Sequence, residues 1–410
     1  MPFKTLYRCF LWLMLLNCLI PSVSAQYFDI TSSQKRVTIP FKLIRNLVVI
    51  KLKINNKGPF NFIMDTGAGI MIITDPTLID SVDIPSQRVL KLSGCATNGD
   101  DYDAYITSEL KVDIPGLTSY GVSAAIVKKD HFGLSNFIGM PIHGLLGYEF
   151  FANLAVKVNF GDSTITVYRP KDTRLFAKGE KVPVTIENHK PYLMAKVHLP
   201  DGSVKESKLV VDLGAGHPLS LDNMADIREF SKKCIAANLG IGFNGPISGY
   251  ISRIKEIEIG KYDIKNLISS FPEDASLRGM LNVKRDGNLG IGLLKRFVVV
   301  FDYPHNAIYL KPGSNFDAPF EHDMSGLEYY AAGDGFKRII ISRVEPGSAG
   351  DQIGLEKDDE ILSINMKPIA DMTLEQIDDL FKSQNDRSLL LEVYHDKKYD
   401  NVIITLKRRI

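Results

Sequence analysis

The chain has 410 residues, of which 49 are basic, 48 are acidic and 45% are hydrophobic. The balanced charge provides no general attraction to nucleic acid or to an anionic membrane, so we expect no nucleic-acid partner. The length is sufficient for two or three domains with their own hydrophobic cores.

Residues 1–25 have the pattern of a secretory signal peptide. Lys4 and Arg8 lie ahead of an apolar run at 9–16, and Val23-Ser24-Ala25 provides a cleavage site of small residues. We therefore expect an exported protein, periplasmic or extracellular, with no membrane span after the signal is removed. The alternative is an uncleaved membrane anchor, although the apolar run is shorter than the ~20 residues that a spanning helix needs.

The first motif that suggests chemistry is Asp65-Thr66-Gly67-Ala68-Gly69. It follows an apparent β-hairpin, whose strands span 47–54 and 60–64 and whose turn is 55–58. Asp65 thus ends an apolar strand, on a turn that glycine makes tight. A carboxylate in such a place is costly to bury without partners, which indicates a functional role.

The same order of elements returns in the second half of the chain. Asp212-Leu213-Gly214-Ala215-Gly216 lies 147 positions after the first motif and follows the apolar run 208–211. An apparent hairpin precedes it again, with a strand at 195–199 and a turn at 200–202. A unit that occurs twice favours a paired arrangement, in which facing turns would let two carboxylates share one proton.

Further matches extend the repeat. Leu110 and Val112 align with Ile257 and Ile259 at the offset of 147. Three longer segments share an offset of 143, namely 144–147 with 287–290, 156–160 with 299–303, and 164–167 with 307–310. One net gap of four residues therefore relates the two halves.

From about residue 36 to residue 312, the chain resembles aspartic proteases of the retropepsin-like and pepsin-like group, with two lobes fused in one polypeptide. The resemblance is carried by Asp65-Thr66-Gly67-Ala68, by Gly144-Leu145-Leu146-Gly147 and by their diverged second copies. It implies a mainly β fold with pseudo-equivalent lobes at 26–170 and 171–315. It also implies that Asp65 and Asp212 form a catalytic dyad, and it implies no metal and no other cofactor.

In such a dyad, two carboxylates about 3 Å apart cannot both ionise, so one keeps a proton while the other activates a water. The substrate would be a peptide or protein. The resemblance gives the neighbouring loop residues a supporting role, and these are Thr66, Gly67, Ala68, Leu213, Gly214 and Ala215.

Leu213 departs from the family pattern. The family has Thr or Ser after each catalytic Asp, and its hydroxyl bonds across to the opposite loop. Thr66 fits this pattern, whereas Leu213 has no hydroxyl. Two functions therefore stay open, namely an aspartic endopeptidase with a less rigid dyad and a non-catalytic peptide-binding protein on the same fold.

In the family, a hairpin flap closes over an extended substrate. The candidates here are two Gly-bearing turns, at 93–99 and 241–245, and the residues that mark them are Gly94, Gly99, Gly242 and Gly245. Both turns lie at nearly the same distance from their Asp motif, which favours flaps. Ordinary hairpin loops are the alternative.

The remainder of the chain, 316–410, resembles a small α+β PDZ domain of the kind found on exported bacterial proteases. A segment of linker composition at 313–319 precedes it, and Glu345-Pro346-Gly347-Ser348 opens its most specific stretch. A capping Thr373 followed by apolar residues at helical spacing predicts an amphipathic helix to Phe381, with strands at 389–394 and 402–406.

The resemblance to PDZ domains implies a site for C-terminal peptides. Its carboxylate-binding loop would fall on Gly326, Leu327, Glu328 and Tyr329, whose backbone N–H groups would bind the peptide carboxylate. Binding of an internal segment and simple packing against the lobes are the alternatives.

Four cysteines are too few for a disulfide scaffold. Cys9 and Cys18 would leave with the signal peptide, and nothing in the sequence pairs Cys95 with Cys234. We therefore expect two free thiols.

Overall fold

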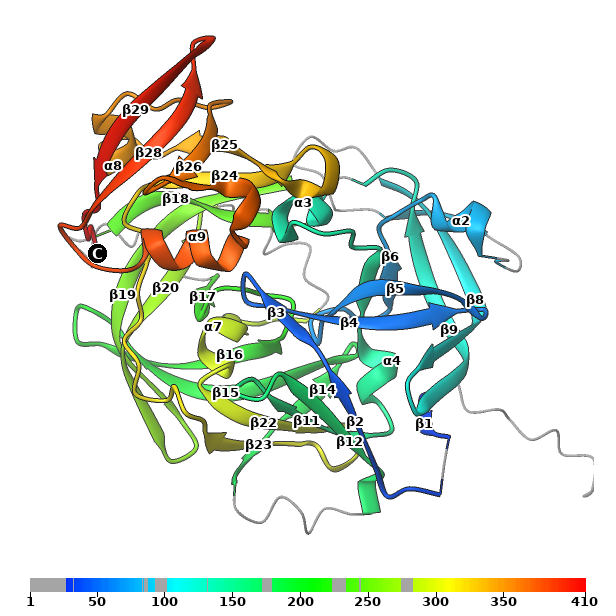
Figure 1. Ribbon diagram of the computed structural model, residues 1–410. Helices are drawn as coiled ribbons and strands as arrows, with labels where there is room; N and C mark the ends of the chain where they lie inside the picture. The colour runs from blue at the N-terminus through cyan, green and yellow to red at the C-terminus, as the bar shows by residue number, and fades with distance from the viewer. Residues whose placement is uncertain are drawn as a thin grey trace, which may run out of the picture.

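The computed structural model describes residues 27–31, 33–82, 84, 88–92, 102–130, 132–171, 179–222, 234–242, 245–273 and 283–410. This part of the chain is mainly β, as predicted, with a few short helices (Figure 1). The predicted signal peptide lies outside the described residues.

The first lobe contains one sheet, to which nine strands of the described ranges belong. The strands are β1 (Asp29–Ile30), β3 (Lys42–Ile44), β4 (Leu47–Ile54), β5 (Lys57–Met64), β6 (Met71–Ile73), β7 (Arg88–Leu92), β8 (Tyr102–Ile114), β9 (Leu117–Val127) and β10 (Gly144–Leu146). Three short helices accompany them, α2 (Leu78–Ser81), α3 (Leu134–Ile138) and α4 (Tyr148–Phe151).

The second lobe repeats this sheet. Its strands are β14 (Thr185–Glu187), β15 (Lys190–His198), β16 (Val204–Asp212), β17 (Leu219–Leu221), β18 (Cys234–Gly242), β19 (Gly245–Ile259), β20 (Tyr262–Pro272) and β21 (Gly287–Gly290), followed by α7 (Ile291–Leu294). In both lobes the strand that carries the Asp motif pairs in parallel with the Gly-rich strand, β5 with β10 and β16 with β21. The predicted duplication is therefore present in the topology.

A third sheet joins the lobes. Its order is β13-β23-β22-β11-β12-β2, so that β22 of one half pairs antiparallel with β11 of the other. The strands are β2 (Arg36–Pro40), β11 (Ala155–Asn159), β12 (Thr164–Tyr168), β13 (Glu180–Pro183), β22 (Phe297–Asp302) and β23 (Ala307–Pro312), with the 3-10 turn η2 (Tyr303–His305) between the last two. Of the segments that the repeat aligned at an offset of 143, 156–160 and 299–303 thus lie on neighbouring strands, and 164–167 and 307–310 lie on the strands that flank them.

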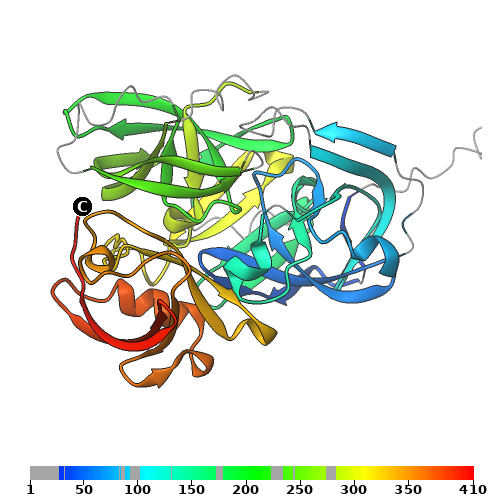
Figure 2. The same ribbon diagram turned by 90° about the horizontal axis from the view of Figure 1, so that it is seen from above.

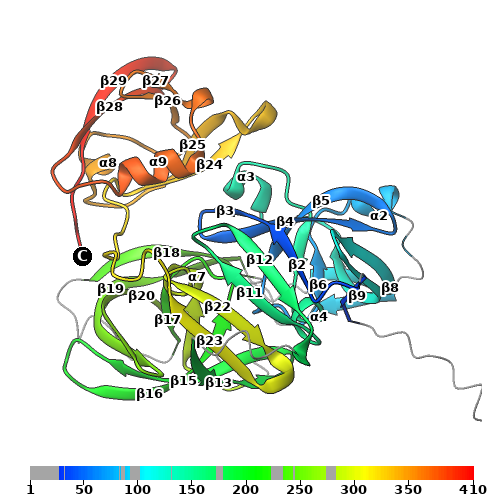
Figure 3. The same ribbon diagram turned by 60° about the horizontal axis from the view of Figure 1, so that its bottom comes forward.

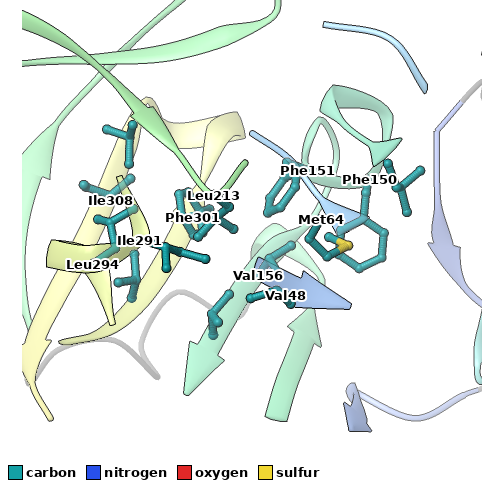
Figure 4. Close-up of a cluster of buried hydrophobic side chains, with 14 of the residues drawn as sticks. Val48, Met64, Phe150, Phe151, Val156, Leu213, Ile291, Leu294, Phe301 and Ile308 are labelled. Atoms are coloured by element: carbon teal, nitrogen blue, oxygen red, sulfur yellow. The ribbon is translucent and has the colours of Figure 1, made fainter. Parts of the chain in front are cut away.

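The hydrophobic core is continuous through both lobes and this joining sheet. The aligned strand residues Leu110, Val112, Ile257 and Ile259 are all fully buried. Figure 4 shows a part of this core in which side chains of both halves lie together. Because alternate residues of a strand point to one face, the period-2 pattern in the sequence determined which side chains enter this core.

The C-terminal domain has its own sheet and core. Its elements are β24 (Leu327–Ala332), η3 (Asp334–Phe336), β25 (Arg338–Val344), α8 (Ala349–Gln352), β26 (Glu360–Ile364), β27 (Lys367–Pro368), η4 (Ile369–Asp371), α9 (Leu374–Phe381), β28 (Ser388–His395) and β29 (Lys398–Thr405). Thr373 caps α9 and forms a reciprocal capping box with Gln376, as the capping signal predicted. The domain packs against both lobes (Figure 2).

The segment at 313–319 is bound to the second lobe and is not a free tether. The guanidinium of buried Arg296 donates to the carbonyls of Asn315, Phe316, Ala318 and Pro319. Composition alone indicated a linker because Gly, Ser, Asn and Pro disfavour regular structure, but their carbonyls remain available to a buried cation.

Candidate active site at the lobe interface

Parallel strand pairs position the two Asp motifs. Asp65 follows the last residue of β5, and its N–H donates to the carbonyl of Leu146 at the end of β10 (2.9 Å). Asp212 is the last residue of β16 and pairs with Gly290 at the end of β21. Each carboxyl group therefore emerges where two parallel strands end, at the same level in the two lobes.

The two carboxyl groups face each other across the interface, and each lies against the glycine of the opposite motif. Each carboxylate also accepts an N–H bond within its own loop, from Gly67 to Asp65 Oδ1 (2.7 Å) and from Gly214 to Asp212 Oδ1 (2.8 Å). A Cβ atom on Gly67 would lie 2.7 Å from the Asp212 carboxylate, and one on Gly214 would lie 2.4 Å from that of Asp65. Only glycine permits this approach.

Burial and the second carboxyl group control the proton. Burial, and after it the neighbouring charge and hydrogen bond of Asp212, together raise the pKa of Asp65 from 3.8 to about 8. At neutral pH, Asp65 is therefore protonated. A carboxyl that keeps its proton beside a second carboxyl can donate to one reacting oxygen while its partner accepts from another.

Thr66 forms the cross-lobe bond that the sequence predicted for it. Its buried hydroxyl donates to the carbonyl of Val211 (2.7 Å) and accepts from the N–H of Leu213 (2.9 Å). Both partners belong to the second lobe. The hydroxyl therefore satisfies one donor and one acceptor of the opposite loop.

Leu213 occupies the equivalent position without a hydroxyl. Its side chain is fully buried and lies beside Phe301 in the core, with Phe151 close by (Figure 4). Full burial of a leucine side chain contributes about 1.5–3 kcal/mol. The second lobe has thus replaced a hydroxyl by apolar packing and leaves no unpaired polar side chain at this position.

A second pair of contacts across the interface was not predicted from the sequence. Asn46 Nδ2, on the turn between β3 and β4, donates to the carbonyl of Gly216 (2.8 Å). His189 Nδ1, on the matching turn between β14 and β15, lies 3.1 Å from the carbonyl of Gly69. Each turn therefore contacts the Asp motif of the opposite lobe. The only sequence signal was that positions 46 and 189 share the offset of 143.

Asn288 is a further polar residue that the sequence did not identify as part of the site. It lies on β21, and its Nδ2 donates to Asp212 Oδ2 (2.9 Å). His217, five residues after Asp212, is also close, and burial lowers its pKa. Asp212 therefore has a side-chain hydrogen-bond donor on β21.

Two segments of the chain match known families. Residues 50–150 match the family model "Aspartyl protease", and residues 340–394 match the family model "PDZ domain". The chain joins an aspartyl protease domain to a PDZ domain. The resemblance drawn from the sequence is thereby confirmed. The first match includes Asp65 and ends before Asp212, so the second motif is related to the first through the repeat.

Two solved structures are among those to which this chain is similar. One is basic 7S globulin from soybean, with 10% identity, a TM-score of 0.40, and coverage of 70% of this chain and 97% of that one. Another is the aspartic proteinase from Irpex lacteus, with 13% identity, a TM-score of 0.45, and coverage of 69% and 99%. No curated protein matches the sequence.

One of the two candidate flap hairpins of the protease domain can be described. Gly242 of β18 pairs directly with Gly245 of β19, so these residues flank the tip of a hairpin. Gly94 and Gly99 lie outside the described residues. Their role as flaps stays a prediction.

The predicted carboxylate loop of the PDZ domain already has partners within the chain. The Gly326 N–H donates to Asp323 Oδ1 (2.7 Å), and the Leu327 N–H donates to Ser325 Oγ (3.1 Å). Gly326 has a left-handed φ of 73°, and a Cβ there would collide with Ser348. These two N–H groups are therefore engaged without a peptide.

Glu328 and Tyr329 contact the protease domain. The Glu328 carboxylate pairs with Arg343 of β25 (2.7 Å) and accepts from Asn238 of the second-lobe hairpin (3.1 Å). Tyr329 lies under Arg45 of the first lobe, whose guanidinium is 4.7 Å from the ring centroid. The PDZ domain thus touches both lobes beside their interface.

One group of possible metal ligands lies away from the dyad, on β15 and β19 of the second lobe. His198, Glu256 and Glu258 bring their ligand atoms within 4.8 Å of one another. Lys196 forms an ion pair with Glu258 (3.6 Å) and Lys265 with Glu256 (3.8 Å). These ion pairs and the His198–Glu258 contact (2.6 Å) account for the cluster without an ion.

Within the described ranges, no helix is long and apolar enough to cross a membrane. Cys234 forms no disulfide there, and Cys95 lies outside those ranges.

Proposed function

We propose that the chain is an exported aspartic endopeptidase. The observation that carries the proposal is the pair Asp65–Asp212, whose carboxyl groups face each other across the two lobes. The raised pKa of Asp65, about 8, agrees with it. The glycine approaches and the Thr66 bonds support it, because they hold the two carboxyl groups in one geometry across the lobes. Export is proposed from the signal-like pattern of residues 1–25.

In the proposed reaction, the charged carboxylate removes a proton from a water as that water attacks the peptide carbonyl carbon. The protonated carboxyl donates its proton to the carbonyl oxygen, which forms a neutral tetrahedral diol. Collapse of the diol returns a proton to the leaving nitrogen and restores the shared proton of the dyad. This sequence needs no covalent enzyme intermediate.

The substrate would be an extended peptide. It would pair its main chain with strand edges beside the dyad, and we propose that the β18–β19 hairpin supplies one of them. The PDZ domain would select or recruit peptide partners, C-terminal peptides among them.

The second candidate is a non-catalytic peptide-binding protein on the same fold. Leu213 favours it, because one of the two cross-lobe hydroxyls is absent. Against it stands the paired geometry of the carboxyl groups, which is costly to maintain without use since two carboxyls are desolvated together.

The two candidates are separated by cleavage of a peptide library, measured at several pH values with the full chain and with Asp65→Asn and Asp212→Asn. The endopeptidase predicts cleavage that each substitution abolishes. Peptide binding without cleavage in the wild type would support the second candidate. Cleavage that survives Asp65→Asn would exclude an aspartic mechanism.

A further inference from the structure

Asn288 gives the dyad an asymmetry that the repeat does not have. Its Nδ2 donates to Asp212 Oδ2, and it pairs with Val210, two residues before Asp212. In the first lobe the same strand position is Leu145, which pairs with Ile63, two residues before Asp65. A leucine has no donor, so only one of the two strand positions supplies a side-chain bond to its carboxylate.

The consequence concerns which oxygen atoms are free to bear the proton. Asp212 accepts an N–H from Gly214 on Oδ1 and from Asn288 on Oδ2, so both of its oxygens face donors. Asp65 accepts from Gly67 on Oδ1 and, among the described residues, has no N–H donor on Oδ2. A protonated oxygen is disfavoured opposite an N–H donor, whereas a charged one is favoured there.

The other titratable and charged groups near the dyad do not create this asymmetry. The positive charge of Lys190 lowers the pKa of Asp65, which favours the charged form of Asp65 and therefore opposes the asymmetry. Burial keeps His217 neutral by lowering its pKa, and burial raises the pKa of both Tyr192 and Tyr303, so these two are neutral as well. Behind His217, Arg285 and Asp222 neutralise each other in an ion pair (3.0 Å).

We propose that Asn288 is a positioning residue that keeps Asp212 as the charged base and leaves the proton on Asp65. The inference rests on the proposed peptidase function, because it assigns roles within that dyad.

The test is the pH profile of kcat/KM for a library-derived peptide. Asn288→Leu copies the first-lobe residue into the second lobe. We expect kcat to fall about tenfold with KM near the wild-type value, and the acidic limb to move up by about one pH unit, since a donor to the charged carboxylate is lost.

Leu145→Asn is the matched variant, because it places a donor on the other carboxyl. It should move the alkaline limb down and leave the acidic limb in place. Asn288→Gln, which keeps an amide, should recover part of the wild-type profile. If Asn288→Leu moves neither limb, or moves the alkaline one, the assignment is wrong.

A measurement without turnover separates this inference from the proposed function. The NMR chemical shifts of the carboxyl ¹³C atoms of Asp65 and Asp212 report the ionisation of each group even in a chain that cleaves nothing. The two signals would be assigned with Asp65→Asn and Asp212→Asn. Asp212 should lose its proton first in the wild type, and the order should become less distinct in Asn288→Leu. If the wild type cleaves nothing but Asp212 still loses its proton before Asp65, the peptidase proposal fails and the role of Asn288 stands. If Asp65 loses its proton first, the role of Asn288 is refuted.

A separate observation concerns the PDZ domain, whose free sheet edge is occupied by the first lobe. β24 lies at the edge of its sheet, beside α9. Arg45 Nη1 donates to the Tyr329 carbonyl (3.0 Å), and Asn136 Nδ2 donates to the Ala331 carbonyl (2.9 Å). Both carbonyls face away from β25, where a peptide strand would bond.

Arg45 also fills the space between β24 and α9. Its Nη2 lies 3.3 Å from Asp378 of α9, and its guanidinium is sandwiched by the rings of Tyr329 and Phe137. Its side chain is 8% exposed. In Figures 1 and 3, α3 of the first lobe lies beside β24. An extended peptide would therefore have to displace Arg45 and α3.

The same turn contacts the second Asp motif. Asn46, which follows Arg45, is the residue that bonds to Gly216 in the second Asp motif. We infer that the first lobe masks the peptide edge of the PDZ domain, so that an extended peptide at β24 competes with Arg45 and loosens a turn that supports the Asp212 loop.

A disulfide tests the masking. A Cβ atom on Gly139 would lie 3.5 Å from the Ala331 Cβ, within the range of about 3.5–4.5 Å for disulfides. We would join the two positions by Gly139→Cys and Ala331→Cys, and remove the other thiols by Cys95→Ser and Cys234→Ser. Peptide binding would be measured with a displayed library of random peptides, some internal and some with free C-termini. The oxidised monomer should capture fewer peptides than its reduced form. Equal capture by the oxidised and reduced forms would overturn the inference.

Hydrogen exchange gives a result without any peptide. Arg45→Ala should raise amide exchange in β24 and in residues 212–217, while exchange in β28 and β29 stays unchanged. Arg408→Ala, which removes an ion pair to Glu321 in the same part of the chain, is the control and should not alter β24. If Arg45→Ala leaves β24 as protected as in the wild type, the edge is not masked by the first lobe.

Discussion

Replacing Thr66 by Val measures the bond between the lobes most directly. Valine keeps the shape of threonine and removes both hydroxyl bonds, leaving the Val211 carbonyl and the Leu213 N–H without partners in a buried interface. An unsatisfied buried group costs about 1–3 kcal/mol, so we expect a loss of about 2–6 kcal/mol in the free energy of unfolding. Because the same loop carries Asp65, kcat should fall as well.

Urea unfolding followed by circular dichroism measures this loss as a lower midpoint at constant m value. Thr66→Ser keeps the hydroxyl and should retain most of the stability. Thr166→Val is the matched control, because the Thr166 hydroxyl bonds only to the exposed hydroxyl of Thr38 among the described residues (3.2 Å) and its loss should cost under about 1 kcal/mol. If Thr66→Val and Thr166→Val shift the midpoint equally, the cross-lobe bond does not hold the lobes together.

Three further results are expected. Gly67→Ala should abolish cleavage, because the added methyl group would overlap the Asp212 carboxylate. Gly161→Ala should leave cleavage unchanged, because the nearest atom to its added Cβ would be 3.5 Å away. Equal activity of the two variants would refute the close approach. Cleavage should decline as pH rises through about 8, where Asp65 loses its proton. The contribution of Asp65 to the free energy of unfolding should be largest below pH 3.8 and should be lost towards pH 8, because the folded chain keeps a proton that the unfolded chain releases. A cleavage rate that does not change up to pH 10 would contradict this. Leu213→Thr should lower the free energy of unfolding by about 2 kcal/mol or more, because core packing is lost. Activity should hold only if the new hydroxyl finds an acceptor. A urea midpoint at or above that of the wild type would show that Leu213 is not needed for packing.

The repeat was readable from the sequence because strand periodicity and glycine turns are local properties. Residues 65–69 and 212–216 each follow an apolar strand, and glycine is required wherever two loops approach closely. Those local signals carry the resemblance to aspartic proteases, and the resemblance in turn implied the mainly β fold and a facing pair of Asp65 and Asp212. The helix at 374–381 followed from its capping residue and its spacing.

Strand ends were predicted less well. The first hairpin turn is only Asn55-Asn56, both with left-handed φ, so β5 begins at Lys57 rather than at residue 60. In the second lobe β15 starts at Lys190, five residues before the predicted strand. Polar residues on the solvent face of a paired strand give no sequence signal, because pairing is decided by the neighbouring strand.

The chain by itself therefore determined two carboxylates, their loops and the domain order. Tertiary structure alone decided which groups surround them. Asn288 reaches Asp212 because β21 runs parallel to β16, and Arg45 reaches Tyr329 because the PDZ domain folds back onto the first lobe. Such contacts join residues 76 and 284 positions apart, and nothing in local propensity encodes which distant polar group will satisfy a buried carboxylate or a strand edge.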